Sequence, residues 1–265
     1  MTALDRDSVI AAENAWILTG PPGTEEIETA EYKLVRLPYG APDLLQLLWV
    51  RTERPAGDVL TEVLDQASGM GEDALFVYAK LDAPAGFDDA LTVRGAELVE
   101  TCDVLAAPLP TDAKAPDLPA LKIEWRISVE TARAVAEIGV EVFGGALPTG
   151  DTLEEALVQR AAAGRESVAA GTGGTVLARL DGTPVGTASL EIVDGVARLA
   201  GGGVLEPYRG KGIYRAMVET RLTYAADHGA TMAFSFGRID TSSPILRRLG
   251  FESYGQERMY RLPLG

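Results

Sequence analysis

Apolar residues recur along the second half of the chain with two spacings, and each spacing predicts one type of element. Apolar and polar residues alternate in four segments, as they do in strands with one buried face: Leu121–Ile127, Thr175–Leu180, Val185–Val193 and Val196–Val204. Apolar residues three or four apart predict helices through Ala132–Val142 and Leu153–Ala163. We expect Ser128 to cap the first helix, and Asp151 or Thr152 to cap the second.

Two short turns join the middle strands into an antiparallel meander. Asp181-Gly182 and Asp194-Gly195 stand between alternating runs, and a type I′ hairpin turn needs positive φ at both central residues, which such pairs tolerate. A helix, a strand, a short helix and a final strand pair are expected after the meander: Ile213–Asp227, Thr231–Phe236, Pro244–Leu249 and Phe251–Leu262. The predicted order from residue 121 is β-α-α-β-β-β-α-β-α-β-β, which is an α+β (mixed α/β) fold.

The first half of the chain repeats parts of the second half at an offset of 155 residues. GAE at 95–97 falls on GFE at 250–252, and RPAG at 54–57 falls on RGKG at 209–212. Residues 59–66 and 75–80 then take the places of the helix and the strand that follow Arg209. So few identities leave two interpretations, namely chance similarity or a shortened copy of the same architecture.

A segment without apolar periodicity separates the two halves. Residues 111–119 read TDAKAPDLP and directly follow Pro110, and such a run of prolines and small polar residues is typical of a linker. The sequence therefore predicts two domains, residues 1–110 and 121–265, with a linker at 111–120.

The composition is that of a soluble globular protein. Of 265 residues, 46% are hydrophobic and 24% are charged, and no run reaches the about 18–20 apolar residues of a membrane span. The N-terminus does not resemble a signal peptide, and Cys102 is the single cysteine, so we expect a cytoplasmic protein without disulfides or membrane contacts. The net charge of −15 disfavours nucleic-acid binding; it serves solubility or attracts a cationic amine.

Histidine and cysteine chemistry is scarce in this chain. With one histidine and one cysteine, a metal site built from these residue types is not expected. His228 precedes Gly229 at the expected end of a helix, where the helix dipole favours a cation, so we expect a structural role for it.

The segment from Gly201 to Tyr214, GGGVLEPYRGKGIY, has the pattern best suited to binding a phosphate group. It links an expected strand to an expected helix, where backbone N–H groups point into one concavity and the helix dipole adds positive charge. Gly210 and Gly212 let the backbone approach a ligand closely, and Arg209 and Lys211 supply positive charge. A plain glycine-rich turn with two solvated cations is the alternative.

This part of the chain resembles the GNAT superfamily of N-acetyltransferases. The family's cofactor signature, Arg/Gln-x-x-Gly-x-Gly/Ala, reads Arg209-Gly210-Lys211-Gly212-Ile213-Tyr214 here, and Val204 stands five residues before the arginine as in the family. Leu249-Gly250-Phe251 after a short helix is a second family mark, and the likeness covers about Leu121–Leu264. The resemblance implies an acetyl-CoA-dependent N-acetyltransferase with a twisted, mostly antiparallel sheet flanked by helices. The first half would be a smaller, degenerate GNAT-like copy.

The resemblance also implies a role for each residue of the loop. The pyrophosphate of coenzyme A would bind to the backbone amides of six residues: Arg209, Gly210, Lys211, Gly212, Ile213 and Tyr214. The strand at Gly203, Val204 and Leu205 would pair with the pantetheine arm, and an amide there would hold the thioester carbonyl. A bound amine would then attack the thioester directly, without a nucleophilic Ser or Cys.

Three positions depart from the family pattern. Tyr214 replaces a small residue, and we expect it to serve packing. Leu246 stands where the family often has a tyrosine that protonates the leaving thiolate, and residues 240–243 (DTSS) replace a frequent asparagine. The general acid is therefore unassigned. Glu191 and Asp240 are the candidate bases, although each also fits a solvated surface carboxylate, and water chains can accept the proton instead.

Other functions compete with this interpretation. An acyl-CoA-binding pseudoenzyme, or a regulatory or structural protein without turnover, fits the missing family residues. A dinucleotide enzyme is disfavoured, because antiparallel hairpins precede the glycine-rich loop.

In the first half, Pro55 lacks an N–H and Asp58 repels phosphate, so we expect one acetyl-CoA per chain. The amine acceptor, the acyl chain and the oligomeric state, a homodimer included, stay open.

Overall fold

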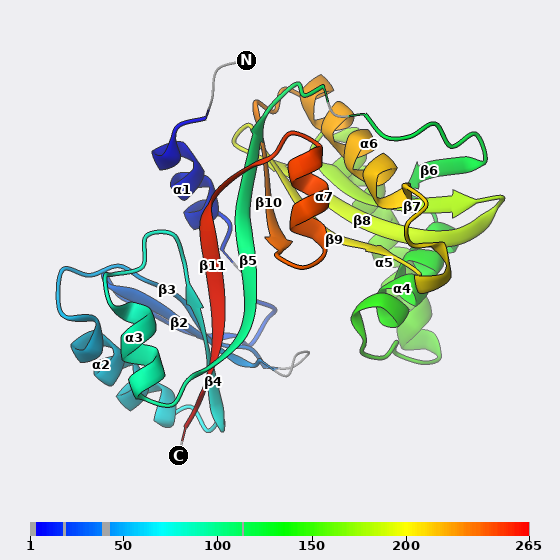
Figure 1. The fold of residues 1–265 in the computed structure, drawn as a ribbon. Coiled ribbons are helices and arrows are strands. Elements are labelled where there is room, and N and C mark those ends of the chain that lie inside the picture. The colour runs from blue at the N-terminus through cyan, green and yellow to red at the C-terminus, as the bar shows by residue number, and fades with distance from the viewer. Residues whose placement is uncertain (1–3, 18–19, 39–42, 113, 265) are drawn as a thin grey trace. The chain divides into compact units, whose positions relative to one another are not determined.

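A computed structural model of the chain describes residues 4–17, 20–38, 43–112 and 114–264 (Figure 1). From residue 121 the elements are β6 (Leu121–Trp125), α4 (Val129–Phe143), α5 (Asp151–Ala169), β7 (Gly173–Leu180), β8 (Thr183–Val193), β9 (Val196–Val204), α6 (Ile213–Asp227), β10 (Met232–Arg238), α7 (Ser242–Arg248) and β11 (Glu252–Pro263). A 3₁₀ turn, Glu206–Tyr208, lies between β9 and α6. The expected element order is confirmed, except that one twelve-residue strand, β11, replaces the expected final strand pair.

Local sequence chemistry explains several of these elements. Ser128 caps α4 in a reciprocal capping box with Thr131, as the sequence predicts for the cap itself. The central residues of both Asp-Gly turns have positive φ, as type I′ hairpins require. The expected caps of α5 are wrong, because Asp151 and Thr152 are its first helical residues and Gly150 precedes them without a side-chain cap.

From its first helix onward, the first half of the chain has the same order of helices and strands as the second half has from α5 onward. These elements are α1 (Arg6–Ala15), β1 (Glu25–Glu28), β2 (Tyr32–Arg36), β3 (Leu45–Val50), α2 (Ala56–Ser68), β4 (Ala74–Ala79), α3 (Phe87–Val93) and β5 (Glu97–Pro108). Shifted by 155 residues, the bounds of α3 and β5 coincide with those of α7 and β11. Strand β3 pairs antiparallel with β2 and parallel with β4, as β9 does with β8 and β10. These matches favour a copy over chance similarity.

The chain divides into two compact units that are discontinuous in sequence. The N-terminal unit comprises Asp5–Val104, Phe236–Pro244 and the chain from Ser253 onward. The C-terminal unit comprises Leu105–Ser235 and Ile245–Glu252, together with Leu4. These units differ from the expected division into residues 1–110 and 121–265. The last part of β5 belongs to the C-terminal unit, and nearly all of β11 belongs to the N-terminal unit, so each half of the chain contributes a strand segment to the other unit.

The strand order within each unit shows the same exchange. In the N-terminal unit the order is β1-β2-β3-β4-β11, and Leu262 of β11 lies opposite Leu75 of β4. In the C-terminal unit the order is β5-β10-β9-β8-β7-β6. The pairs are antiparallel from β6 to β9, and β9 and β10 are parallel. A mixed, mostly antiparallel sheet flanked by helices is confirmed.

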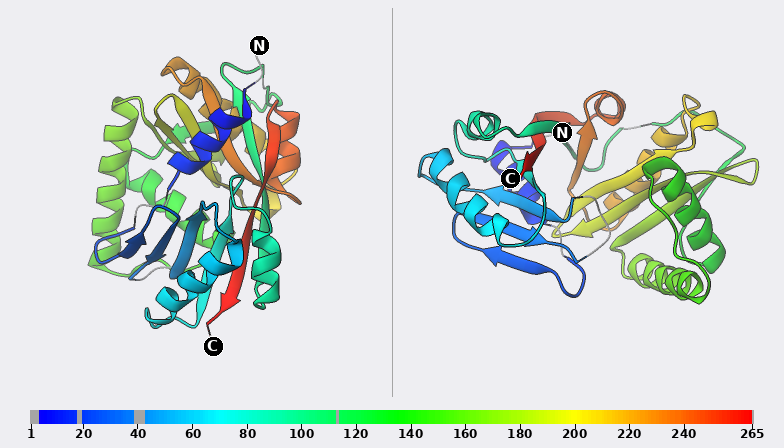
Figure 2. Two further views of the ribbon diagram at one scale, coloured as in Figure 1. Left: turned by 90° about the vertical axis from the view of Figure 1, so that its left-hand side faces the viewer. Right: turned by 90° about the horizontal axis from the view of Figure 1, so that it is seen from below.

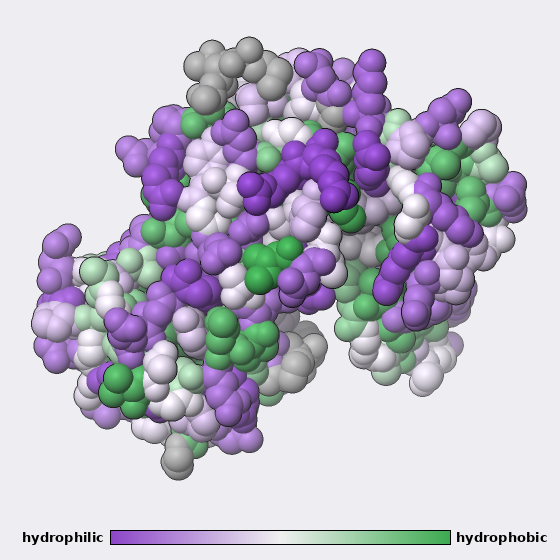
Figure 3. Space-filling model, viewed as in Figure 1, coloured by the Kyte–Doolittle hydropathy of each residue, from purple (hydrophilic) through white to green (hydrophobic). Residues whose placement is uncertain are grey.

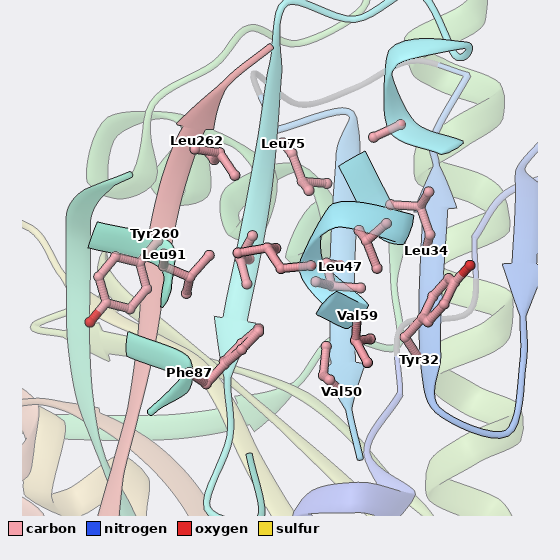
Figure 4. Close-up of a cluster of buried hydrophobic side chains, with 14 of the residues drawn as sticks. Tyr32, Leu34, Leu47, Val50, Val59, Leu75, Phe87, Leu91, Tyr260 and Leu262 are labelled. Carbon is pink, nitrogen blue, oxygen red and sulfur yellow. The ribbon is translucent and has the colours of Figure 1, made fainter. Parts of the chain in front are cut away.

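The core of the N-terminal unit lies between its sheet and the helices α2 and α3. Figure 4 shows residues of strands and helices converging on this core, among them Leu34, Leu47, Val59, Leu75 and Leu91. Tyr260 and Leu262 of β11 belong to the same cluster, with 7% and 1% of their surface exposed. The last strand of the chain therefore completes a core that the first hundred residues otherwise supply.

In the C-terminal unit both faces of the sheet are covered. Successive residues of β7 alternate between faces, so Val176 and Ala178 pack with residues of α6, whereas Leu177 packs with residues of α4. Figures 1 and 2 show α4 and α5 on one face of strands β7–β9 and α6 on the other. The sheet thus places the start of α6 beside the end of β9, which positions the glycine-rich loop.

The surface is mixed in character. On the face that Figure 3 shows, hydrophobic residues form separate small patches among hydrophilic ones. No helix in the described part of the chain is long and apolar enough to cross a membrane.

Candidate functional site

Strand β9 contains a bulge in its run of glycines. The register with β8 pairs Ala200 with Ser189 and Gly203 with Thr187, so Gly201 and Gly202 together face the single residue Ala188. Gly201 has a φ of 55°, which is strained for residues with a side chain. A bulge interrupts the ladder and redirects backbone groups, and bulges are frequent beside active sites. The parallel register with β10 covers Val196–Arg198, so the bulge lies beyond it.

Side chains from two helices contact the bulge from opposite faces of the sheet. A Cβ atom at Gly202 would lie 2.7 Å from Cε2 of Tyr214 on α6, and a Cβ atom at Gly203 would lie 2.5 Å from Cγ1 of Val142 on α4. Both distances are shorter than carbon atoms tolerate. These glycines therefore let α6 and α4 approach the strand closely.

The loop after β9 turns sharply into α6. Gly210 and Gly212 have φ values of 76° and 87°, and no side chain of the described residues caps the helix at Gly212. The first amides of α6 are therefore available to an external acceptor, and the helix dipole favours an anion there. Arg209 Nε donates to the carbonyl of Val204 at 3.0 Å, and Lys211 Nζ lies 5.1 Å from the centre of the Tyr208 ring.

The expected linker lies across the beginning of α6. Arg215 donates to the carbonyl of Lys114 at 3.0 Å, and Glu219 accepts from the amide of Ala115 at 2.9 Å. A Cβ atom at Gly212 would lie 2.4 Å from Cγ of Pro116. Gly212 is therefore needed both for its positive φ and for the passage of the linker.

An open groove of about 470 Å³ lies between the linker and α6, lined by residues of both and by two residues of β6: Ala115, Pro116, Asp117, Leu118, Leu121, Ile123, Ala216, Glu219 and Thr220. The carboxylates of Asp117 and Glu219 make this groove unsuitable for phosphate groups.

The comparisons with known proteins identify this region. Residues 146–249 match the family model described as the Acetyltransferase (GNAT) family. This segment is a GNAT-family domain. The resemblance drawn from the signature Arg209–Tyr214 is confirmed, because that signature lies inside the matched segment. A comparison with curated proteins gives no match.

Solved structures resemble the whole chain, not only the GNAT domain. A GCN5-related N-acetyltransferase from Kribbella flavida is 21% identical with a TM-score of 0.63, covering 91% of this chain and 90% of that one. A GCN5-related N-acetyltransferase from Sphaerobacter thermophilus is 18% identical with a TM-score of 0.66, covering 88% and 81%. A tandem GNAT protein from the clavulanic acid biosynthesis pathway is 20% identical with a TM-score of 0.62, covering 97% and 88%. At these identities the likeness shows the fold, which includes the first half of the chain.

The loop equivalent to Arg209–Gly212 in the first half differs in charge and backbone chemistry. Arg54 pairs with Glu31 at 2.6 Å and with Glu62 at 3.2 Å, so two carboxylates neutralise it. Pro55 precedes α2 at its N-terminus and has no N–H to donate. The GNAT domain therefore has the loop better suited to an anion.

The two candidate bases lie in different units. Glu191, exposed on β8 of the GNAT domain, lies opposite Arg198 of β9, and their side chains approach to 3.4 Å. Asp240 is exposed in the turn between β10 and α7 and belongs to the N-terminal unit. Leu246 of α7 is buried in the core beside α6, with 1% of its surface exposed. The roles of Glu191 and Asp240 stay predictions.

Sequence reasoning missed Arg221, a buried cation behind the loop. Arg221 is 1% exposed; its Nε donates to the carbonyl of Met217 at 3.0 Å and its Nη1 to that of Ser189 at 2.7 Å. The guanidinium also interacts with the hydroxyl of Tyr214. The sequence did contain a signal for its burial. Arg221 stands seven residues after Tyr214 and lies on the same buried stripe of α6 as Met217, Val218 and Ala225.

His228 ends α6 as expected. It is the C-cap residue, its Nδ1 lies 2.7 Å from the carbonyl of Tyr224, and the two rings stack with centroids 3.9 Å apart. Gly229 follows with a φ of 84°. This geometry supports the structural role.

Proposed function

We propose that this protein is an acyl-CoA-dependent N-acetyltransferase whose cofactor binds at the loop between β9 and α6. The uncapped N-terminus of α6 carries this proposal, because it follows two glycines of positive φ within a segment that matches the GNAT family. Arg209 and Lys211 add positive charge to this loop in a chain whose net charge is −15.

In this proposal, the loop and the end of β9 bind different parts of the cofactor. The amides from Arg209 to Tyr214 hold the pyrophosphate, and the strand segment Gly203–Leu205 pairs with the pantetheine arm. The bulge at Gly201 and Gly202 offers redirected amides to the thioester carbonyl, where negative charge develops during attack. The site thus supplies electrostatic stabilisation without a covalent enzyme intermediate.

The amine acceptor attacks the thioester carbon directly. The C–N bond forms, the C–S bond breaks, and the amine proton passes to Glu191, Asp240 or water. The acidic chain favours a cationic amine over an anionic acceptor. We further propose one cofactor per chain, because the equivalent loop of the first half contains Pro55 and the neutralised Arg54.

Calorimetric titration with acetyl-CoA tests the cofactor site. Gly210→Glu places a carboxylate in open space at the loop, because among the described residues only Gly210 and its chain neighbours come within 4 Å of a Cβ at this position, and we expect severe loss of binding. Gly182→Glu is the matched control, because Gly182 has a similar φ of 80°, equal open space and a place in the same unit. Equal affinities of the two variants would contradict the proposed site, and two equivalent sites per chain would contradict the stoichiometry.

An acceptor screen separates the enzyme from a binding protein. Amines of several classes are incubated with acetyl-CoA and the protein, and free thiol is detected. Release above the enzyme-free rate supports the acetyltransferase. Acetyl-CoA binding without turnover on a broad panel would favour the acyl-CoA-binding pseudoenzyme.

A further inference from the structure

The burial of Arg221 calls for an explanation beyond packing. No carboxylate among the described residues pairs with this guanidinium, which donates to the backbone carbonyls of Met217 and Ser189. Burial lowers the pKa of Arg221 to about 10, so the side chain stays a cation at neutral pH. A buried, unpaired charge costs stability, and a methionine of similar length would avoid that cost. The charge is therefore expected to act on a neighbouring group.

Tyr214 is that neighbour, because it stands about two helical turns before Arg221 on the same helix and packs against the core on which Arg221 is buried. Arginine has N–H donors and no acceptor, so its contact with Tyr214 uses the phenol oxygen as acceptor and leaves the phenol hydrogen free for another partner. Burial raises the pKa of Tyr214, while the charge of Arg221 opposes that rise. The cation thus stabilises the deprotonated form of this tyrosine.

The hydroxyl of Tyr214 lies at the bulge of β9. A Cβ atom at Gly202 would be 3.5 Å from the phenol oxygen. The proposed function places the thioester at this bulge, so the hydroxyl is near the bond that breaks. Leu246, at the position where the GNAT family often has a tyrosine, is 1% exposed and has no ionisable group to donate a proton.

We propose that Tyr214 is the proton donor of the acetyl transfer and that Arg221 is its positioning residue; this inference rests on the proposed function. As the amine nitrogen bonds to the carbonyl carbon, the C–S bond breaks and its electron pair goes to sulfur. The sulfur takes the proton of Tyr214, and the guanidinium of Arg221 stabilises the tyrosinate. The tyrosinate regains a proton from solvent, which has received the proton that the amine released.

Two substitutions and a control test the pair. Tyr214→Phe keeps the ring against Gly202 and removes the proton, Arg221→Met removes the charge, and Arg221→Lys restores it. Tyr224→Phe is the control, because Tyr224 is on the same helix and donates to the carbonyl of Val168 at 2.9 Å. The probes are acetyl-CoA with hydroxylamine, a small amine that needs no built acceptor site, and thiol release is measured with the enzyme-free rate subtracted.

We expect Tyr214→Phe to lower kcat by roughly 10²–10⁴-fold, the usual contribution of general acid catalysis, with the Kd of acetyl-CoA unchanged. Arg221→Met lowers kcat in the same direction, Arg221→Lys recovers part of the loss, and Tyr224→Phe keeps the wild-type rate. Melting temperatures and acetyl-CoA affinity report whether each variant folds. If Arg221→Met does not fold, Tyr214→Phe and Arg221→Lys decide the question.

Each other result overturns a defined part of the proposal. A wild-type rate in Tyr214→Phe removes the proton donor and leaves the acetyltransferase intact. Equal losses of affinity and of kcat would make Tyr214 a cofactor-binding residue and also refute its role as donor. A wild-type protein that binds acetyl-CoA without accelerating thiol release would refute the acetyltransferase itself.

Discussion

Leu262 belongs to the last strand of the chain, yet the structure predicts that it stabilises the unit built mainly from the first hundred residues. It is 1% exposed, lies opposite Leu75 across the β11–β4 ladder and packs in the core with Val77. Truncating a fully buried leucine to alanine costs about 2–5 kcal/mol, because transfer energy is lost and a cavity remains. Leu262→Ala should therefore destabilise the N-terminal unit by that amount.

The reciprocal substitution lies in the first half of the chain. Leu105 of β5 is fully buried in the core of the C-terminal unit, with Leu199 of β9 and Val218 of α6. Leu105→Ala should cost a similar free energy, about 2–5 kcal/mol, in the C-terminal unit. Leu98 is the control, because it lies on the same strand and is 54% exposed, so its truncation should have little effect.

Amide hydrogen exchange followed by mass spectrometry locates each loss. Because 1.4 kcal/mol is a factor of ten in an equilibrium, even the lower bound of 2 kcal/mol speeds exchange through opening of a unit by roughly 30-fold. Leu262→Ala should accelerate exchange in β3, β4 and α2, and Leu105→Ala in β9 and α6. Faster exchange of β9 and α6 in Leu262→Ala, with β3 and β4 unchanged, would refute the strand exchange.

Three further outcomes follow from single sites. Burial raises the pKa of Glu13 and of Glu257 to about 7, so the folded state holds protons that the unfolded chain releases near pH 4.5. This stabilisation is complete below pH 4.5 and is lost as pH rises through 7. The melting temperature should thus fall between about pH 4.5 and pH 7, and a fall of the same size in Glu13→Gln would contradict this. Gly212→Ala should reduce both stability and acetyl-CoA affinity, and adding Pro116→Gly should recover part of both, in thermal and calorimetric titrations. Ser128→Ala should cost about 1 kcal/mol in urea unfolding, and no change would show that the capping box is dispensable.

The elements with local signals were predictable from the sequence. Helix α6 begins at Ile213 and ends at Asp227 as expected, because its apolar stripe and the flanking glycines mark both ends. The meander was predictable because Asp-Gly pairs specify their turn without help from distant residues. The exchange of strand segments between the two units was not predictable from the sequence. The alternating pattern of β5 or β11 indicates that one face of the strand is buried, but it does not indicate which strands lie beside it.

The candidate site divides in the same way. The loop was predictable because glycines at 210 and 212 report local backbone needs. The bulge depends on how β9 pairs with β8, so the run of glycines alone showed flexibility and not its geometry. Arg221 was missed because charged helix residues are usually exposed, and its position on an apolar stripe was the available contrary signal.

The strand exchange also gives the first half of the chain a physical role that does not require a cofactor. In its loop, Pro55 has no N–H to donate and Arg54 forms ion pairs with two carboxylates. Both features disfavour binding of a pyrophosphate. Its strand β5 nevertheless supplies Leu105 and Ala107 to the core beneath α6. A fragment that kept these residues but lacked β4 would leave Tyr260 and Leu262 of β11 without their core. We therefore expect the first half of the chain to be required for the fold of the chain that carries the proposed site, whatever its own loop can bind.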